Sequence, residues 1–253
     1  MAKDTAKNKK SDTKGKENAL DMAAGNGADV EKKRELIKEY RTVYSGGVGE
    51  LIEKKSRFIA TVKPVETEEE AVAFIEELKK KYWDATHNCS AFVLGTRGEV
   101  TRCSDDGEPS GTAGRPMLDV LMGGGVRNVC VVVTRYFGGT LLGTGGLVRA
   151  YSASVQEGLK QCILIDKKLA CQIKLTSDYS DVGKLQYLIA GRGYTTLNSE
   201  FTDHVEITVL VPVDDQRAFE KQITEATAGR TGWEAMDETY YAVAEGEILL
   251  FDH

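Results

Sequence analysis

The sequence predicts an α+β protein of two domains, and three observations support this prediction. A β-branched run at 129–134 lies between amphipathic helical patterns at 67–82 and 144–162, which predicts a sheet covered by helices. After residue 168, strand and helix patterns follow the order βαββαβ of a ferredoxin-like split sandwich. The chain has 253 residues, 41% of them apolar, which is enough for two cores.

The first domain is expected over residues 40–165. Thr67 and Glu70 predict a capping box at a helix start, because each side chain can accept a hydrogen bond from a free backbone amide. Pro116 suits the first turn of a helix, where its missing N–H does no harm. The expected elements are strands at 41–44 and within 49–62, a helix over 67–82, a hairpin with strands at 89–94 and 99–103, a short helix over 116–122, a strand at 128–135 and a helix over 144–162.

The second domain is expected over residues 166–253, with the boundary at 163–168. Pro212 followed by Asp214 and Asp215 predicts a helix start, because carboxylates favour the positive N-terminal end of a helix. The expected elements are strands at 169–175, 194–200, 204–211 and 233–244 and helices over 181–190 and 214–228.

Residues 1–39 are expected to form a basic tail and a linker. Over 1–30, lysines alternate with small polar residues, and such a segment cannot offset the entropy of ordering, so disorder is predicted. The tail either contacts RNA or serves only as a solvated extension. A short helix over 31–40 is expected to lead into the first domain.

Composition excludes several classes of function. A net charge of −6 argues against a protein that coats nucleic acid, although a local basic patch remains compatible with it. No apolar run approaches about 18 residues and no secretory signal is visible, so we expect a cytoplasmic protein without a membrane partner. The five cysteines lack Cys-x-x-Cys spacing, which favours reduced thiols over a zinc site. No metal, cofactor or DNA partner is predicted.

The segment 104–152 carries the strongest functional signal, because glycine-rich turns stand beside arginines and an acidic loop. Planar arginine side chains bind phosphate and carboxylate groups, and helix starts offer free amides to anions. The predicted anion- or RNA-binding residues are Arg115, Arg135, Gly138, Gly139, Gly143, Thr144, Gly145, Gly146 and Arg149. Two alternatives stay open. The arginines could pair with the acidic loop, and the glycines could allow close packing of a helix on a sheet.

The signature acidic loop consists of Asp105, Asp106, Glu108 and Ser110. Its carboxylates suit Mg²⁺ or general acid–base catalysis, but a capped, solvated loop is favoured over both. A Ser-His-acid triad is not expected, because no Gly-x-Ser-x-Gly elbow occurs.

Three residues outside this segment are expected to support the site: Lys55, Arg57 and His87. His87 acts either as a base or as a hydrogen-bonded structural histidine. Tyr136 and Phe137 either stack on bases or belong to the core.

Several long strings resemble the signature of the YigZ/IMPACT family. SDDGEPSGTAGRP at 104–116, TRYFGG at 134–139 and GGLVRAY at 145–151 carry the resemblance, and KKSRFIA at 54–60 and ATHNC at 85–89 resemble the earlier motifs of the family. The resemblance is strong over 40–165 and extends to 167–253 in pattern only.

The resemblance implies a first domain similar to domain 2 of ribosomal protein S5, an α/β sandwich, and a second domain similar to the last domain of elongation factor G. Eukaryotic members regulate translation by competing for a partner of the kinase that senses amino-acid starvation. Because only a short polar tail precedes residue 40, their additional N-terminal RWD domain is not expected here. The implied function is a cytoplasmic, translation-linked binding protein that engages RNA, the ribosome or a translation factor through the glycine/arginine face.

Two other classes of function stay open. One is an enzyme that binds a phosphate or a nucleotide at the glycine-rich helix start, as small-molecule kinases of similar fold do, although Leu147, Val148 and Arg149 follow the glycines here instead of a Ser/Ala-rich continuation. The other is an adaptor that binds only proteins. Turnover of a nucleotide favours the enzyme, and salt-sensitive RNA binding without turnover favours the RNA-binding protein.

Overall fold

A computed structural model describes residues 37–244 and 246–251. The predicted tail at 1–30 and most of the predicted helix over 31–40 lie outside these residues. The end of that helix prediction is wrong, because Tyr40 lies in strand β1 (Glu39–Ser45). Within the described part of the chain, the helices are too short or too polar to span a membrane.

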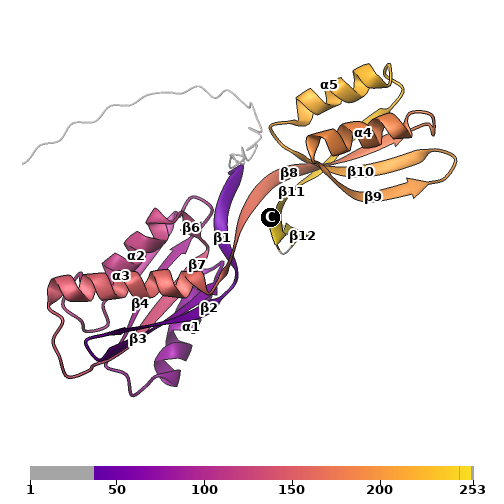
Figure 1. Cartoon of the computed structure of the whole chain (residues 1–253). Helices are drawn as coiled ribbons and strands as arrows, with labels where there is room; N and C mark the ends of the chain where they lie inside the picture. Colours follow the sequence, from indigo (N-terminus) through magenta and orange to yellow (C-terminus); the bar gives the residue numbers. More distant parts are fainter. Residues whose placement is uncertain (1–36, 245, 252–253) are drawn as a thin grey trace, which may run out of the picture. The chain divides into compact units, whose positions relative to one another are not determined.

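The chain has the predicted two-domain α+β fold, and its first domain is built on a five-stranded antiparallel sheet (Figure 1). The strand order is β2 (Gly47–Glu53), β3 (Ser56–Pro64), β7 (Val129–Tyr136), β4 (His87–Leu94) and β5 (Val100–Ser104). β7 is the central strand and is buried on both faces. A strand covered on both faces reads as a continuous apolar run, which is why residues 129–133 are apolar without alternation.

Helices cover both faces of this sheet (Figure 1). α1 (Glu68–Lys81) packs Phe74 and Leu78 against Phe92 and Val132. On the other face, α2 (Gly114–Gly123) and α3 (Thr144–Lys160) contribute to a second apolar cluster. The main members of that cluster are Phe58, Val131, Val133, Met117, Leu121, Leu147, Tyr151 and Val155.

The predicted capping of α1 is confirmed at Thr67, whose side chain accepts a hydrogen bond from the Glu70 amide at 3.2 Å. The Glu70 carboxylate accepts from the amide of Glu66, one residue before the cap, at 2.7 Å. Both side chains therefore satisfy backbone amides that the helix leaves free.

Glycines allow α3 to approach the sheet closely. A Cβ at Gly49 of β2 would lie 2.5 Å from the Glu157 backbone, and a Cβ at Gly158 would lie 3.0 Å from Ala60 and Val62. Neither position has room for a side chain, so these glycines set the separation between α3 and strands β2 and β3.

The second domain has the predicted βαββαβ order. Its elements are β8 (Ile163–Ser177), α4 (Val182–Arg192), β9 (Thr195–Phe201), β10 (Val205–Pro212), α5 (Gln216–Ala226) and β11 (Gly232–Ala244). The strands pair antiparallel in the order β11-β8-β10-β9, which is the ferredoxin-like arrangement. The helices pack Leu185, Ile189, Phe219 and Ile223 onto this sheet.

Strand β8 is longer than predicted and includes the expected boundary at 163–168. Its first part pairs antiparallel with β1, and β1 also pairs in parallel with β6 (Val126–Arg127). β12 (Glu247–Phe251) pairs with β11 and was not predicted. Separate folding of the two domains stays a prediction.

The start of α5 also differs from the prediction. The helix begins at Gln216, and its N-cap residue Asp215 makes no side-chain capping bond. Instead, Asp215 accepts a hydrogen bond from the Tyr194 hydroxyl at 3.0 Å, and Asp214 pairs with Lys38. The two carboxylates therefore bind side chains of neighbouring segments and do not cap the amides of α5.

Candidate functional site

The register of strand pairing brings distant motifs together at one end of the first sheet. His87 of β4 and Phe58 of β3 both lie opposite Arg135 of β7. The acidic loop leaves β5 at Ser104 and leads into α2, so it passes the same end of the sheet. The motifs that contain these residues therefore meet at one end of the sheet.

A buried ion pair lies at the centre of this site. Arg135 Nη1 donates to Glu108 Oε1 at 2.5 Å, and the Tyr151 hydroxyl donates to the same oxygen at 2.8 Å. Arg135 is 5% exposed, and its guanidinium lies 5.4 Å from the Phe58 ring centroid and 5.6 Å from that of Phe137. The alternative of internal pairing thus holds for Arg135, which belongs to a buried network instead of an exposed anion-binding face.

The buried network extends to both sides of this pair. Arg135 Nη2 and the Gly138 amide both donate to Ser56 Oγ, at 3.4 and 3.2 Å. Cys89 Sγ lies 3.3 Å from the Tyr151 hydroxyl. Burial raises the pKa of the Cys89 thiol to about 12 and raises the pKa of the Tyr151 hydroxyl, so both groups carry their protons at neutral pH.

Asp105 caps the start of α2. Its carboxylate accepts hydrogen bonds from the amides of Gly111, Ala113 and Gly114 at 2.8, 3.0 and 2.8 Å. Burial acts to raise the pKa of Asp105, but these three amide bonds outweigh it and hold the pKa below its usual value. The anion site at this helix start is thus filled by the chain's own carboxylate.

Asp106 fixes His87. Its carboxylate accepts from the Asn88 amide at 2.6 Å, and its carbonyl oxygen lies 2.8 Å from His87 Nδ1. The three acidic residues therefore face different partners, as expected of a capped loop. Among the described residues, no group of three or more His, Cys, Asp or Glu side chains could hold a metal ion.

The start of α3 differs from that of α2, because no side chain caps it. Gly143 at the cap has φ of +70°, and the amides of Thr144, Gly145 and Gly146 have no acceptor within the described part of the chain. A Cβ at Gly143 or Gly145 would meet open space, so packing does not explain these two glycines. By contrast, close packing does require Gly138, whose Cβ would lie 2.0 Å from the Lys55 backbone.

The remaining predicted cations do not converge. Arg115 pairs with Asp119 at 2.8 Å and Arg57 pairs with Glu50 at 2.8 Å, both on the surface. Arg149 is exposed on α3 and has no partner among the described residues. Lys55 is exposed in the β2–β3 turn with φ of +67°.

Two further predicted residues lie at the surface. Ser110 is exposed and makes no hydrogen bond to any other described residue. Gly139 has φ of +82°, and a Cβ there would meet nothing within 4 Å, so its backbone conformation and not its packing explains the glycine.

A pocket of about 420 Å³, here called the α3 pocket, opens beside the uncapped start of α3. Phe137, Leu141, Leu142 and Leu147 form its apolar walls, His87, Glu108 and Arg135 contribute its polar groups, and its other lining residues are Thr86, Gly107, Pro109, Gly143 and Thr144. The volume lies within the range of small-molecule sites, and an apolar pocket with a few polar groups is their usual composition.

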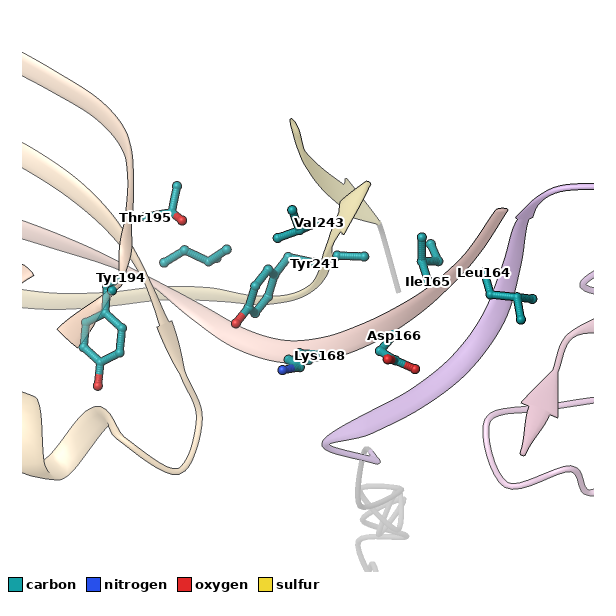
Figure 2. Close-up of a pocket in the computed structure, with 11 residues that line it drawn as sticks. Leu164, Ile165, Asp166, Lys168, Tyr194, Thr195, Tyr241 and Val243 are labelled. Carbon is teal, nitrogen blue, oxygen red and sulfur yellow. The ribbon is translucent and has the colours of Figure 1, made fainter. Parts of the chain in front are cut away.

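A second hollow of about 380 Å³ lies along β8 and β11 in Figure 2. Lys168 and Asp166 of β8, Tyr241 of β11 and Tyr194 are among its lining residues. Asp166 already pairs with Arg41 at 2.8 Å. Because its lining contains no residue of the signature strings, we place the candidate site at the α3 pocket.

Sequence reasoning missed the pocket walls and part of the buried network. Leu141 and Leu142 stand in an irregular segment between β7 and α3, where no periodicity marks a buried face. Tyr151 belongs to the apolar cluster under α3, and spacing along the helix does not reveal that its hydroxyl donates to Glu108. The register between strands β4 and β7 pairs His87 with Arg135. A prediction of this register would have revealed the site.

The comparisons with known proteins cover both domains. The family model described as Impact N-terminal domain matches residues 54–159, and a model described as a domain of unknown function (DUF1949) matches 175–230. A solved structure described as "Crystal structure of an hypothetical protein" has a TM-score of 0.50 and 32% identity, covering 80% of this chain and 99% of that chain.

Two bacterial relatives match over most of their length. IMPACT family member YvyE of Bacillus subtilis is 40% identical over 213 residues, which is 84% of this chain and 98% of YvyE. IMPACT family member YigZ of Escherichia coli is 36% identical over 187 residues, which is 73% of this chain and 92% of YigZ. Protein IMPACT of Mus musculus is 37% identical over 98 residues, which is only 30% of that protein. The chain therefore belongs to the IMPACT family.

Proposed function

We propose that this chain is a cytoplasmic RNA-binding protein linked to translation, and that it holds a phosphate group of the RNA at the start of α3. The observation that carries the proposal is the set of three amides at Thr144, Gly145 and Gly146, which have no acceptor among the described residues and follow Gly143 at the edge of a pocket. Free amides and the helix dipole together attract a phosphate. The neighbouring start of α2 serves as an internal reference, because the Asp105 carboxylate already fills the same kind of site there.

Charge supports a local contact instead of a broad basic surface. The net charge is −6, and of the predicted arginines only Arg149 is exposed and unpaired among the described residues. A contact limited to one or two phosphates gives weak salt dependence, with a slope of about −0.7 per phosphate for single strands. We therefore expect a slope between about −0.7 and −1.4 for the logarithm of the binding constant against the logarithm of the salt concentration.

The test replaces Gly145, where a Cβ meets open space. Gly145→Asp places a carboxylate at the free amides and should weaken binding of a single-stranded RNA at least about tenfold, because the side chain competes with phosphate. Gly145→Asn has the same size without the charge and should bind much more like the parent. Fluorescence anisotropy with a labelled RNA at several salt concentrations measures both. Equal affinity for the two variants would contradict the proposal.

Arg149→Ala should reduce the salt slope by about 0.7, because one phosphate contact is lost. Arg217→Ala is the matched control, since Arg217 is an exposed arginine on α5 in the second domain. Affinity capture from lysate should lose its partners on ribonuclease treatment. Capture that resists ribonuclease would instead support a translation factor or another protein as the partner.

A second candidate function, a phosphate- or nucleotide-binding enzyme, is favoured by the volume of the α3 pocket, which suits a small molecule. Saturable turnover of a nucleotide by the purified protein would establish it, and binding without turnover would leave RNA recognition as the function.

A further inference from the structure

The floor of the α3 pocket presents a specific pattern of hydrogen-bonding groups, and this pattern can be read group by group. His87 Nδ1 lies 2.8 Å from the carbonyl oxygen of Asp106. A carbonyl oxygen only accepts, so Nδ1 carries the proton and Nε2 of the neutral ring is an acceptor. In this tautomer, the neutral His87 ring offers a lone pair to the pocket that it lines.

Glu108 supplies a second acceptor. Its Oε1 is occupied by Arg135 and Tyr151, whereas Oε2 accepts no hydrogen bond from the described residues. Glu108 Oε2 lies 3.9 Å from His87 Nε2, too far for a hydrogen bond between them. The two acceptors thus stand side by side, and a ligand with two adjacent N–H donors would satisfy both.

Arg135 supplies an unused donor. Its Nε is buried and has no hydrogen-bond partner among the described residues, although the other guanidinium nitrogens are engaged. A buried donor without an acceptor is costly and rare in native proteins. This nitrogen is buried from solvent, so the pocket does not present it to a ligand, and the pattern that a ligand meets consists of the two acceptors.

The two neighbouring acceptors complement the edge of guanine, which carries the N1–H and N2–H donors side by side. Adenine presents a different pattern, with one amino donor and an unprotonated N1. The exposed ring of Phe137 and the side chains of Leu141 and Leu142 offer apolar surface to the faces of a base. A pocket of about 420 Å³ has room for one purine.

We propose that the α3 pocket binds a guanine base, either of a free nucleotide or of an unpaired residue in RNA, with His87 and Glu108 accepting from its N–H groups. The phosphate of that nucleotide lies at the start of α3, a part of the proposal that rests on the proposed function. The base selectivity does not depend on that part, so the two can be tested separately.

The experiment titrates the full chain with GMP, IMP, AMP, guanosine and ribose 5-phosphate by isothermal titration calorimetry. GMP should bind at least tenfold more tightly than AMP, and IMP, which lacks the 2-amino group, should lie between them. Guanosine should compete with GMP, and ribose 5-phosphate should bind more weakly than GMP by tenfold or more. Equal binding of GMP and AMP overturns the guanine inference, whatever the result for phosphate.

Variants assign the selectivity to the pocket. His87→Leu removes the acceptor and should reduce the preference for GMP over AMP at least several-fold, whereas His204→Leu, in the second domain, should leave it unchanged. Leu141 is 83% exposed, so Leu141→Ala should fold normally and weaken GMP binding. Unchanged selectivity in His87→Leu contradicts the role given to His87.

Gly145→Asp separates the two proposals. In one outcome, the chain binds GMP more tightly than AMP, and Gly145→Asp binds GMP as tightly as the parent does. The phosphate site at α3 is then wrong and the guanine pocket stands. If RNA and ribose 5-phosphate bind in a manner that depends on Gly145 but no base is preferred, the phosphate site stands and the guanine pocket is wrong. A comparison of GMP with an oligonucleotide that contains one unpaired guanosine distinguishes the free nucleotide from RNA.

Discussion

Arg135 Nη1 and Glu108 Oε1 lie 2.5 Å apart, and the two side chains expose 6% and 3% of their surfaces. A charge so deeply buried is tolerated because its partner and further hydrogen bonds compensate it. Tyr151 and Ser56 supply those bonds. The signature residues thus hold the end of the sheet together before any ligand is considered.

Arg135→Ala should lower the free energy of unfolding by about 3–5 kcal/mol, because it leaves the Glu108 carboxylate buried and unpaired. Arg115→Ala is the matched control and should cost no more than about 1 kcal/mol, since the pair between Arg115 and Asp119 is exposed. Urea denaturation measures both. A loss below about 1 kcal/mol for Arg135→Ala would show that the pair contributes little.

The double variant Arg135→Met, Glu108→Leu tests the same buried ion pair by removing both of its charges. Replacing both charges with apolar groups should recover most of the stability lost in Arg135→Ala, because no buried charge is then unpaired. The double variant should nevertheless lose GMP selectivity, since Glu108 belongs to the proposed pocket floor.

Much of the fold could be predicted from the sequence, because it rests on local patterns. β7 is visible as an apolar run without alternation at 129–133 because helices cover both of its faces. The spacing of apolar residues predicts helices α1 and α3, and Thr67 predicts the start of α1. The short strands β6 and β12 were not predicted, because a few residues carry too little periodicity.

The site could be predicted only in part, because its geometry depends on contacts between distant segments. The signature strings predict a region for the site, yet nothing local distinguishes the buried Arg135 from the exposed Arg149. The partner of Arg135 stands 27 positions away in a loop, and its position depends on strand register. The pocket walls come from an irregular segment whose path no pattern describes.

Asp105→Asn should destabilise the fold relative to the parent. The loss should be larger near neutral pH than at low pH. The pKa of Asp105 lies below its usual value of 3.8 in the folded chain, so its ionised form stabilises the fold above the unfolded pKa. This contribution falls as the pH drops through the folded pKa. We expect the parent to exceed the variant by about 1–2 kcal/mol at pH 7, as for a helix cap, and the difference to shrink below pH ~4.

Chemical denaturation at a series of pH values measures this difference. Asp119→Asn provides the control, because Asp119 pairs with Arg115 on the surface and does not cap α2. A difference between the parent and Asp105→Asn that stays constant from pH 7 to pH 3 would contradict the capping role.

A fragment of residues 167–253 should unfold cooperatively by itself. Its sheet and both its helices share a core that includes Ile173, Leu185, Phe219 and Ile223. The pairing of β8 with β1 is lost in the fragment, but the four-stranded order β11-β8-β10-β9 remains. Thermal unfolding followed by circular dichroism tests this, and a broad transition without a cooperative midpoint would show that the second domain depends on the first.

Two glycines of the first domain should respond in opposite directions to alanine. At Gly49, the added Cβ would lie 2.5 Å from the Glu157 backbone, so α3 must move away from β2 or the strand must shift. We expect a loss of about 1–3 kcal/mol in the free energy of unfolding, as for overpacking in a core. At Gly145 the Cβ meets open space within the first turn of α3, and alanine should add up to about 1 kcal/mol. Urea denaturation of both variants measures the contrast, and stabilisation by Gly49→Ala would mean that α3 does not approach β2 this closely.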